Sequence, residues 1–134
     1  MNAFFDRFKD PLVLLGRLLI ATIFVGAGYS KIGGYAATQG YMESMGVPGA
    51  LLPLVIFVEL GGGLAIVLGL LTRLAALGLA VFSIASGVIF HGGSADQIQQ
   101  IMFMKNLAMA GGFLFLVANG AGRLSLDAKL FGKT

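Results

Sequence analysis

Residues 51–73, LLPLVIFVELGGGLAIVLGLLTR, form an apolar run in which Glu59 is the only charged residue before the closing Arg73. A helix of about 20 apolar residues is long enough to cross the hydrocarbon core of a bilayer. The run therefore predicts a membrane-spanning helix. It also raises a question about Glu59, because no other acid in the chain lies inside so long an apolar stretch.

The composition of the whole chain indicates that lipid is its main solvent. Of the 134 residues, 57% are hydrophobic and 11% are charged, and the mean hydropathy is +0.92, whereas about 25% of the residues of a soluble domain are charged. Four windows are apolar enough to span a membrane. A β-barrel is excluded, because its strands alternate apolar and polar residues with period two, whereas these windows are continuously apolar. We predict an all-α integral membrane protein, a four-transmembrane-helix bundle in a single domain of residues 1–134, with spans at 11–30, 51–71, 74–90 and 102–121.

The cations outside these windows predict the orientation, because positively charged loops stay in the cytoplasm. Only Lys31 and Lys105 flank the first and third connections. The N-terminus, the second connection and the C-terminus carry six cations, Arg7, Lys9, Arg73, Arg123, Lys129 and Lys133. We therefore predict that both termini are cytoplasmic. In the first outer connection, ATQGYMESMG at residues 37–46 is apolar on one side and predicts a short interfacial helix.

A cleavable signal peptide is the alternative interpretation of the first window. Asp6 and Asp10 spoil the basic leader that such a peptide needs, and Arg17 interrupts its apolar region. We therefore treat the first window as a retained span.

The absence of cysteine limits the redox chemistry that this chain can perform. With no cysteine there is no internal disulfide relay and no thiolate-bound iron–sulfur cluster. The single histidine, His91, cannot by itself form a bis-histidine haem site or a zinc-binding histidine cluster, and we predict no metal site. Electrons would have to pass through a bound organic molecule or another subunit. For a chain this apolar we predict the lipid bilayer as the partner, and we predict no nucleic-acid partner.

Glu59 needs a partner, because it lies roughly 13 Å below the outer start of its helix. A charged side chain near the bilayer centre costs about 2.5–3.5 kcal/mol, so such residues face the bundle interior and are paired. Lys105 lies a few residues into the fourth span, within about 6–8 Å of the same depth, and Asn106 follows it as a donor and acceptor. We predict a Glu59–Lys105 pair.

The candidate site is therefore an intramembrane polar group of Glu59, Lys105 and Asn106, rimmed by His91 and Lys31 and open toward the outer leaflet. The alternative is that Glu59 and Lys105 form an ion pair that only sets the helix register. Arg17 lies near the inner end of the first span, where its side chain either extends to the headgroups or has a buried role. No catalytic residue is assigned by these patterns.

An ordered set of motifs resembles the DoxX family, in particular its YqjF-like branch of bacterial inner-membrane proteins. The motifs are GRLLIATIFVGAGYSKIGGY, YMESMGVPG, VELGGGLAIVLGLLTRLAAL, MFMKNLAMAGGFLFL and NGAGRLSLD, and the resemblance extends over nearly the whole chain, from about Arg17 to Asp127. The resemblance implies a multi-pass inner-membrane bundle. It also implies that six residues occupy the family's usual polar positions, namely Arg17, Lys31, Glu59, Arg73, Lys105 and Asn106.

Some members of that family are described as accessory subunits of quinone-linked oxidoreductases, whereas many have no assigned activity. The resemblance therefore implies an accessory subunit whose cavity holds a quinone, with a redox partner subunit. The alternatives are a module that binds or transports a small molecule, and a membrane scaffold for a partner complex. Rows of small residues at Thr22, Gly26 and Ser30 and at Ala108 and Gly112 would suit helix packing or homo-oligomer contacts. Whether the chain has enzyme activity of its own stays open.

Overall fold

A computed structural model describes residues 1–93 and 95–132, and within these residues every regular element is helical. The short helices are α1 (Asn2–Arg7), α3 (Tyr35–Ser44), the 3₁₀ turn η1 (Gly49–Leu51), α4 (Leu52–Ile56), the π-helical turn η2 (Phe57–Gly61), α5 (Gly62–Leu68) and α8 (Leu126–Phe131). The long helices are α2 (Lys9–Gly33), α6 (Thr72–His91) and α7 (Gln97–Asn119).

Four helical segments in the described residues are long and apolar enough to cross a membrane. Three are α2, α6 and α7, and the fourth is the continuous segment Gly49–Leu68, which we call the second spanning helix. The predicted all-α fold with four such helices is confirmed. The first connection, where the sequence predicts a short helix, contains α3.

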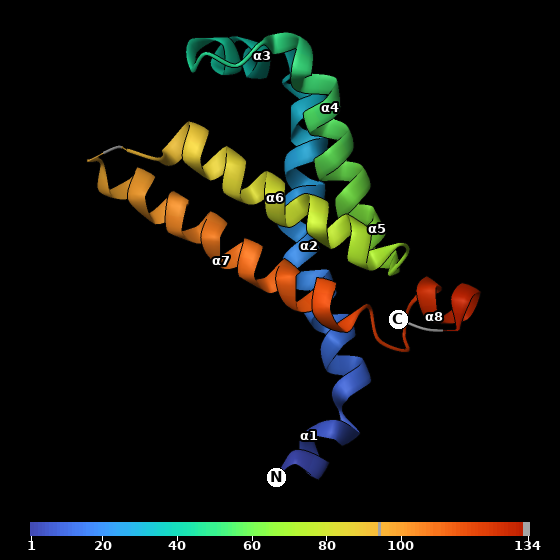
Figure 1. Cartoon of the computed structure of the whole chain (residues 1–134). Helices are drawn as coiled ribbons and strands as arrows, with labels where there is room; N and C mark the ends of the chain where they lie inside the picture. Colours follow the sequence, from blue (N-terminus) through green and yellow to red (C-terminus); the bar gives the residue numbers. More distant parts are fainter. Residues whose placement is uncertain (94, 133–134) are drawn as a thin grey trace.

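The four helices are arranged as two pairs. The second spanning helix runs along α2, and α6 and α7 form a hairpin that crosses this pair obliquely (Figure 1). We call the end at which α2 begins and α7 finishes the terminal end, because α1 and α8 lie there. We call the other end, which carries α3 and the connection from α6 to α7, the distal end.

The buried core is small and lies where the two pairs cross. Phe24, Ile66, Leu79 and Phe113 are its large side chains, and the rings of Phe24 and Phe113 meet edge to face with centroids 5.4 Å apart. Many other large apolar side chains point outward, such as Phe57, which is 73% exposed. This pattern is expected where lipid is the surrounding solvent, because apolar side chains then need not be buried in protein.

Glycine at two positions allows α2 and the second spanning helix to approach closely. A Cβ added at Gly28 would lie 2.8 Å from the Cβ and 2.9 Å from the backbone N of Leu60, and one at Gly63 would lie 2.9 Å from Cγ2 of Val25. The backbones are therefore close enough that even a methyl group does not fit at Gly28.

The row of Thr22, Gly26 and Ser30 does not make the contact of α2 with the second spanning helix. All three residues are exposed, and no atom lies within 4 Å of a Cβ built at Gly26. The contact is made through Gly28. Small residues lie on two faces of α2, and composition does not tell which of these faces is buried.

Gly28→Ala is expected to lower the free energy of unfolding by about 1–3 kcal/mol, because the new methyl group overpacks the contact with the backbone of Leu60. Gly26→Ala is the matched control. It adds the same methyl group to the same helix in open space, so it should leave stability unchanged or raise it by up to about 1 kcal/mol. Unfolding titrations in detergent micelles would compare the two; equal effects would contradict the close crossing.

Candidate functional site

A cavity of about 470 Å³ opens at the distal end, between α2, α3, the second spanning helix and the α6–α7 hairpin. Its walls are mainly apolar, with Leu54, Phe82 and Met109 among the lining residues. Five of the six predicted site residues line this cavity, although they come from four different helices: Lys31, Glu59, His91, Lys105 and Asn106. The sixth, Arg17, lies elsewhere.

Glu59 belongs to the π-helical turn Phe57–Gly61, and only 6% of its surface is exposed. Single π-helical turns within α-helices occur frequently at functional sites. The Glu59 Oε1 atom lies 2.7 Å from Nζ of Lys31, which forms an ion pair with it from the last turn of α2. The predicted need for a partner is therefore met inside the bundle.

The prediction that Lys105 is the partner of Glu59 is wrong. Lys31 is one helical turn beyond Gly28, and Glu59 precedes Leu60, so the close crossing of the two helices brings their side chains together. Lys105 is exposed on α7, and among residues 1–93 and 95–132 it has no ion-pair partner. Similar depth along the spanning helices does not tell which neighbouring helix faces Glu59.

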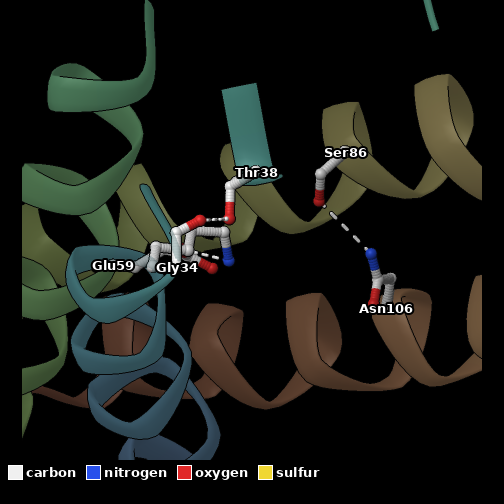
Figure 2. Close-up of polar contacts among 6 residues, drawn as sticks. Gly34, Thr38, Glu59, Ser86 and Asn106 are labelled. Carbon is white, nitrogen blue, oxygen red and sulfur yellow. Dashed lines mark hydrogen bonds and ion pairs between the residues drawn. The ribbon is translucent and has the colours of Figure 1, made fainter. Parts of the chain in front are cut away.

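Asn106 forms a second polar group with α6. Its side-chain amide donates to the backbone O of Ser83 at 3.1 Å and to Oγ of Ser86 at 3.3 Å, and Figure 2 shows Ser86 and Asn106 facing each other across the hairpin. Gly87 makes room for this contact, because a Cβ there would lie 3.1 Å from Cβ of Asn106. Asn106 therefore joins α7 to α6 and does not complete a pair between Glu59 and Lys105.

Ser83 is a cavity residue that the sequence analysis missed. Ser83 lines the cavity, and its buried hydroxyl has no hydrogen-bond partner within the described part of the chain. A buried hydroxyl without a partner costs free energy. It is therefore a group to which a bound molecule could donate or from which it could accept. The sequence contained no signal for it, because serine is common in spanning helices and has no charge to reveal it.

The rim of the cavity is formed by α3 and by the end of α6. The ring of Tyr41 on α3 stacks on Phe90 with centroids 5.6 Å apart. Thr38 donates to the backbone O of Gly34 at 2.9 Å, in the first turn of α3 (Figure 2). His91 Nδ1 is hydrogen-bonded to the side chain of Gln99, so this predicted rim residue already has a partner that joins α6 to α7.

Arg17 has a buried role at the terminal end, and the alternative that it extends to the headgroups is wrong. Its side chain is 1% exposed, and its Nη2 donates to the backbone O of Leu124. Asp127 on α8 interacts with it electrostatically. Asp127 is not among the predicted site residues, because it lies outside the apolar windows. Its signal in the sequence is the helix-start pattern of Ser125 followed by an acid in the first turn.

The chemistry available in the distal cavity is binding by hydrogen bonds and charge. Lys105 offers a cation at the rim, Ser83 offers a hydroxyl that no described residue pairs with, and Lys31 and Glu59 contribute an ion pair. In the described residues no three His, Cys, Asp or Glu side chains are grouped so that they could hold a metal ion.

Comparison with known proteins gives a consistent family relationship. The DoxX family model matches residues 12–92. Inner membrane protein YqjF of Escherichia coli (strain K12) is 50% identical over 124 residues, which are 92% of this chain and 95% of that protein. Inner membrane protein YphA of the same organism is 34% identical over 132 residues, covering 93% of this chain and 94% of its own. An uncharacterised membrane protein of Mycobacterium tuberculosis is 31% identical over 137 residues, covering 90% and 82%. No solved structure matches the chain.

Proposed function

Because this chain belongs to the DoxX family of multi-pass bacterial inner-membrane proteins, we propose that it is an accessory subunit of a quinone-linked redox system. The distal cavity is the quinone site. The observation that carries the proposal is the combination, in one cavity of about 470 Å³, of apolar walls with the buried Ser83 hydroxyl, which has no hydrogen-bond partner among residues 1–93 and 95–132.

The cavity suits an amphiphile with a flat polar ring. Pockets for small organic ligands are mostly apolar and have a few polar groups that fix the orientation of the ligand. Here the Ser83 hydroxyl and the Lys105 ammonium group can each donate to a ring carbonyl, while Leu54 and Phe82 contact the apolar part. A bound quinone would supply the capacity to accept two electrons and two protons.

The Lys31–Glu59 pair has the role of holding and moving a proton beside the ring. Glu59 is almost fully buried, whereas 26% of the Lys31 side chain is exposed. A proton can therefore reach the pair from the rim through Lys31 and pass to the carboxylate. The electrons come from a partner subunit, since the chain has no cysteine and a single histidine.

We also propose that the terminal end faces the cytoplasm. The cations Arg7, Lys9, Arg73 and Arg123 lie at or beyond that end of the spanning helices, as expected for cytoplasmic segments. The cavity then opens toward the outer leaflet, with α3 lying at the interface above it.

The test is binding of a short-chain ubiquinone to the purified protein, measured by equilibrium dialysis in detergent. The double variant Ser83→Ala, Lys105→Met is expected to bind it about tenfold to a hundredfold more weakly, because each lost hydrogen bond contributes about 0.5–1.5 kcal/mol, or more when the donor is charged. The double variant Ser44→Ala, Lys129→Met, which changes the same residue types away from the cavity, should bind like wild type. Equal binding by both double variants, or none by wild type, would refute the quinone site.

A second candidate function is the binding or transport of a small anion. The observation that favours it is that Lys105 lines the cavity rim and, within the described chain, has no ion-pair partner. Uptake of an aromatic carboxylate into proteoliposomes should then depend on Lys105. Unchanged flux in Lys105→Ala would count against transport.

A further inference from the structure

A second cavity, of about 460 Å³, lies at the terminal end between α2 and α7. The lining residues that determine its charge and its shape are Lys9, Gly16 and Arg17 of α2 and Gly112, Phe115 and Asn119 of α7. It shares no lining residue with the distal cavity. We propose that it is a binding site for one anionic phospholipid, with the phosphate near Lys9 and Asn119 and an acyl chain between Gly16 and Gly112.

The charges around this cavity favour an anion. Two cations, Lys9 and Arg17, line it, and no acidic residue does. Lys9 is exposed at the start of α2 and has no ion-pair partner in the described part of the chain. Basic pockets between spanning helices are a recognised setting for anionic headgroups.

Arg17 adds to this positive charge from inside the bundle. It is 1% exposed, and among the described residues its Nε and Nη1 atoms have no hydrogen-bond partner, although Nη2 donates to the backbone O of Leu124. A buried cation with unused donors is costly. Its positive charge would attract a phosphate in the cavity through space, in addition to its interaction with Asp127.

The shape of the cavity indicates a lipid and not a free phosphate ion. Gly16 lines it, and no atom lies within 4 Å of a Cβ built there, while Gly112 lies beside Ile20. Apart from Lys9, Arg17 and Asn119 the lining is apolar, with Val13 between the two cations and Ile20, Phe115 and Leu116 beside them. From Lys9 to Ile20 the helix rises roughly 16 Å, which is enough to accompany a large part of an acyl chain.

The test is native mass spectrometry of the full chain, released from micelles that contain equal amounts of dioleoyl phosphatidylglycerol and dioleoyl phosphatidylethanolamine. Wild type is expected to retain one phosphatidylglycerol in preference to phosphatidylethanolamine. Lys9→Gln should reduce that preference about fivefold, which is the usual effect of one cation near anionic headgroups. Arg7→Gln removes a cation from the same terminal segment outside the cavity, and it should have little effect.

A second pair of variants tests the shape without changing the charge. Gly16→Leu should place a side chain in the cavity, because no atom lies within 4 Å of a Cβ built at Gly16, and it should reduce phosphatidylglycerol retention at least fivefold. Gly26→Leu adds the same side chain to α2 outside the cavity, where the Cβ position is equally open, and should retain the lipid. Equal retention of the two phospholipids by wild type would overturn the proposal. So would retention by Gly16→Leu that matches Gly26→Leu. Neither outcome depends on whether the distal cavity binds quinone.

Discussion

Asp127→Ala is expected to lower the free energy of unfolding by about 3–5 kcal/mol. The two carboxylate oxygens of Asp127 accept hydrogen bonds from the backbone N–H groups of Leu71, at 2.7 Å, and Thr72, at 2.9 Å. Asp127 thus satisfies donors at the start of α6, whose N-cap residue Leu71 makes no side-chain capping hydrogen bond. Its removal would leave these donors without a partner and Arg17 without its nearby negative charge. Unfolding titrations in micelles would measure the loss.

The matched control is Asp96→Ala at the start of α7. Asp96 also accepts a backbone hydrogen bond, from Ile98 N at 2.8 Å, but it does so at an exposed position. The loss there should be about 1 kcal/mol. Asp127→Asn keeps one acceptor and should fall between the two. If Asp127→Ala proved no more destabilising than Asp96→Ala, then α8 would not hold the terminal end together as the structure indicates.

Gly69→Ala is expected to lower the free energy of unfolding by about 2–4 kcal/mol, for two reasons. Gly69 has φ +69, a left-handed conformation that costs an alanine about 1–2 kcal/mol. Its Cβ would also overlap Nη1 of Arg17 and Cβ of Ser125, and such overpacking costs about 1–3 kcal/mol. The carbonyl of Gly69 accepts from Asp127 N at 2.8 Å, so the turn cannot move away without breaking that bond.

Gly46→Ala separates the two contributions to this loss. Gly46 has φ +80, but no atom lies within 4 Å of the Cβ position. It should therefore show only the backbone cost of about 1–2 kcal/mol. A Gly69→Ala variant as stable as Gly46→Ala would show that the contact between the turn, Arg17 and Ser125 is loose.

The four spanning helices could be predicted from the sequence because their signal is local. Hydropathy summed over about 20 residues does not depend on which neighbour a helix has. The structure extends the first span to Lys9–Gly33 and places the last at Gln97–Asn119. The π-helical turn at Phe57–Gly61 was not predictable in the same way, because its residues are as apolar and helical as those around them.

The sequence predicts which residues lie together in the candidate site, but it does not predict which of them contact each other. Five of the predicted residues line one cavity, because polar groups within apolar helices avoid lipid and so share the bundle interior. The partner of Glu59 was assigned to the wrong helix, and the hydroxyl of Ser83 was overlooked. Asp127 was overlooked because its role depends on a contact with a turn that is 55 residues away in the sequence.

The sequence by itself determined that this chain crosses the membrane with four helices and that Glu59 needs a buried partner, because the free energy of placing apolar or charged groups in hydrocarbon is a property of each segment alone. Only the tertiary structure decided that the partner is Lys31 and that Arg17 is buried beside Asp127. These pairings depend on how each helix is rotated about its axis and on where backbones cross. At Gly28 the crossing is set by a single missing side chain.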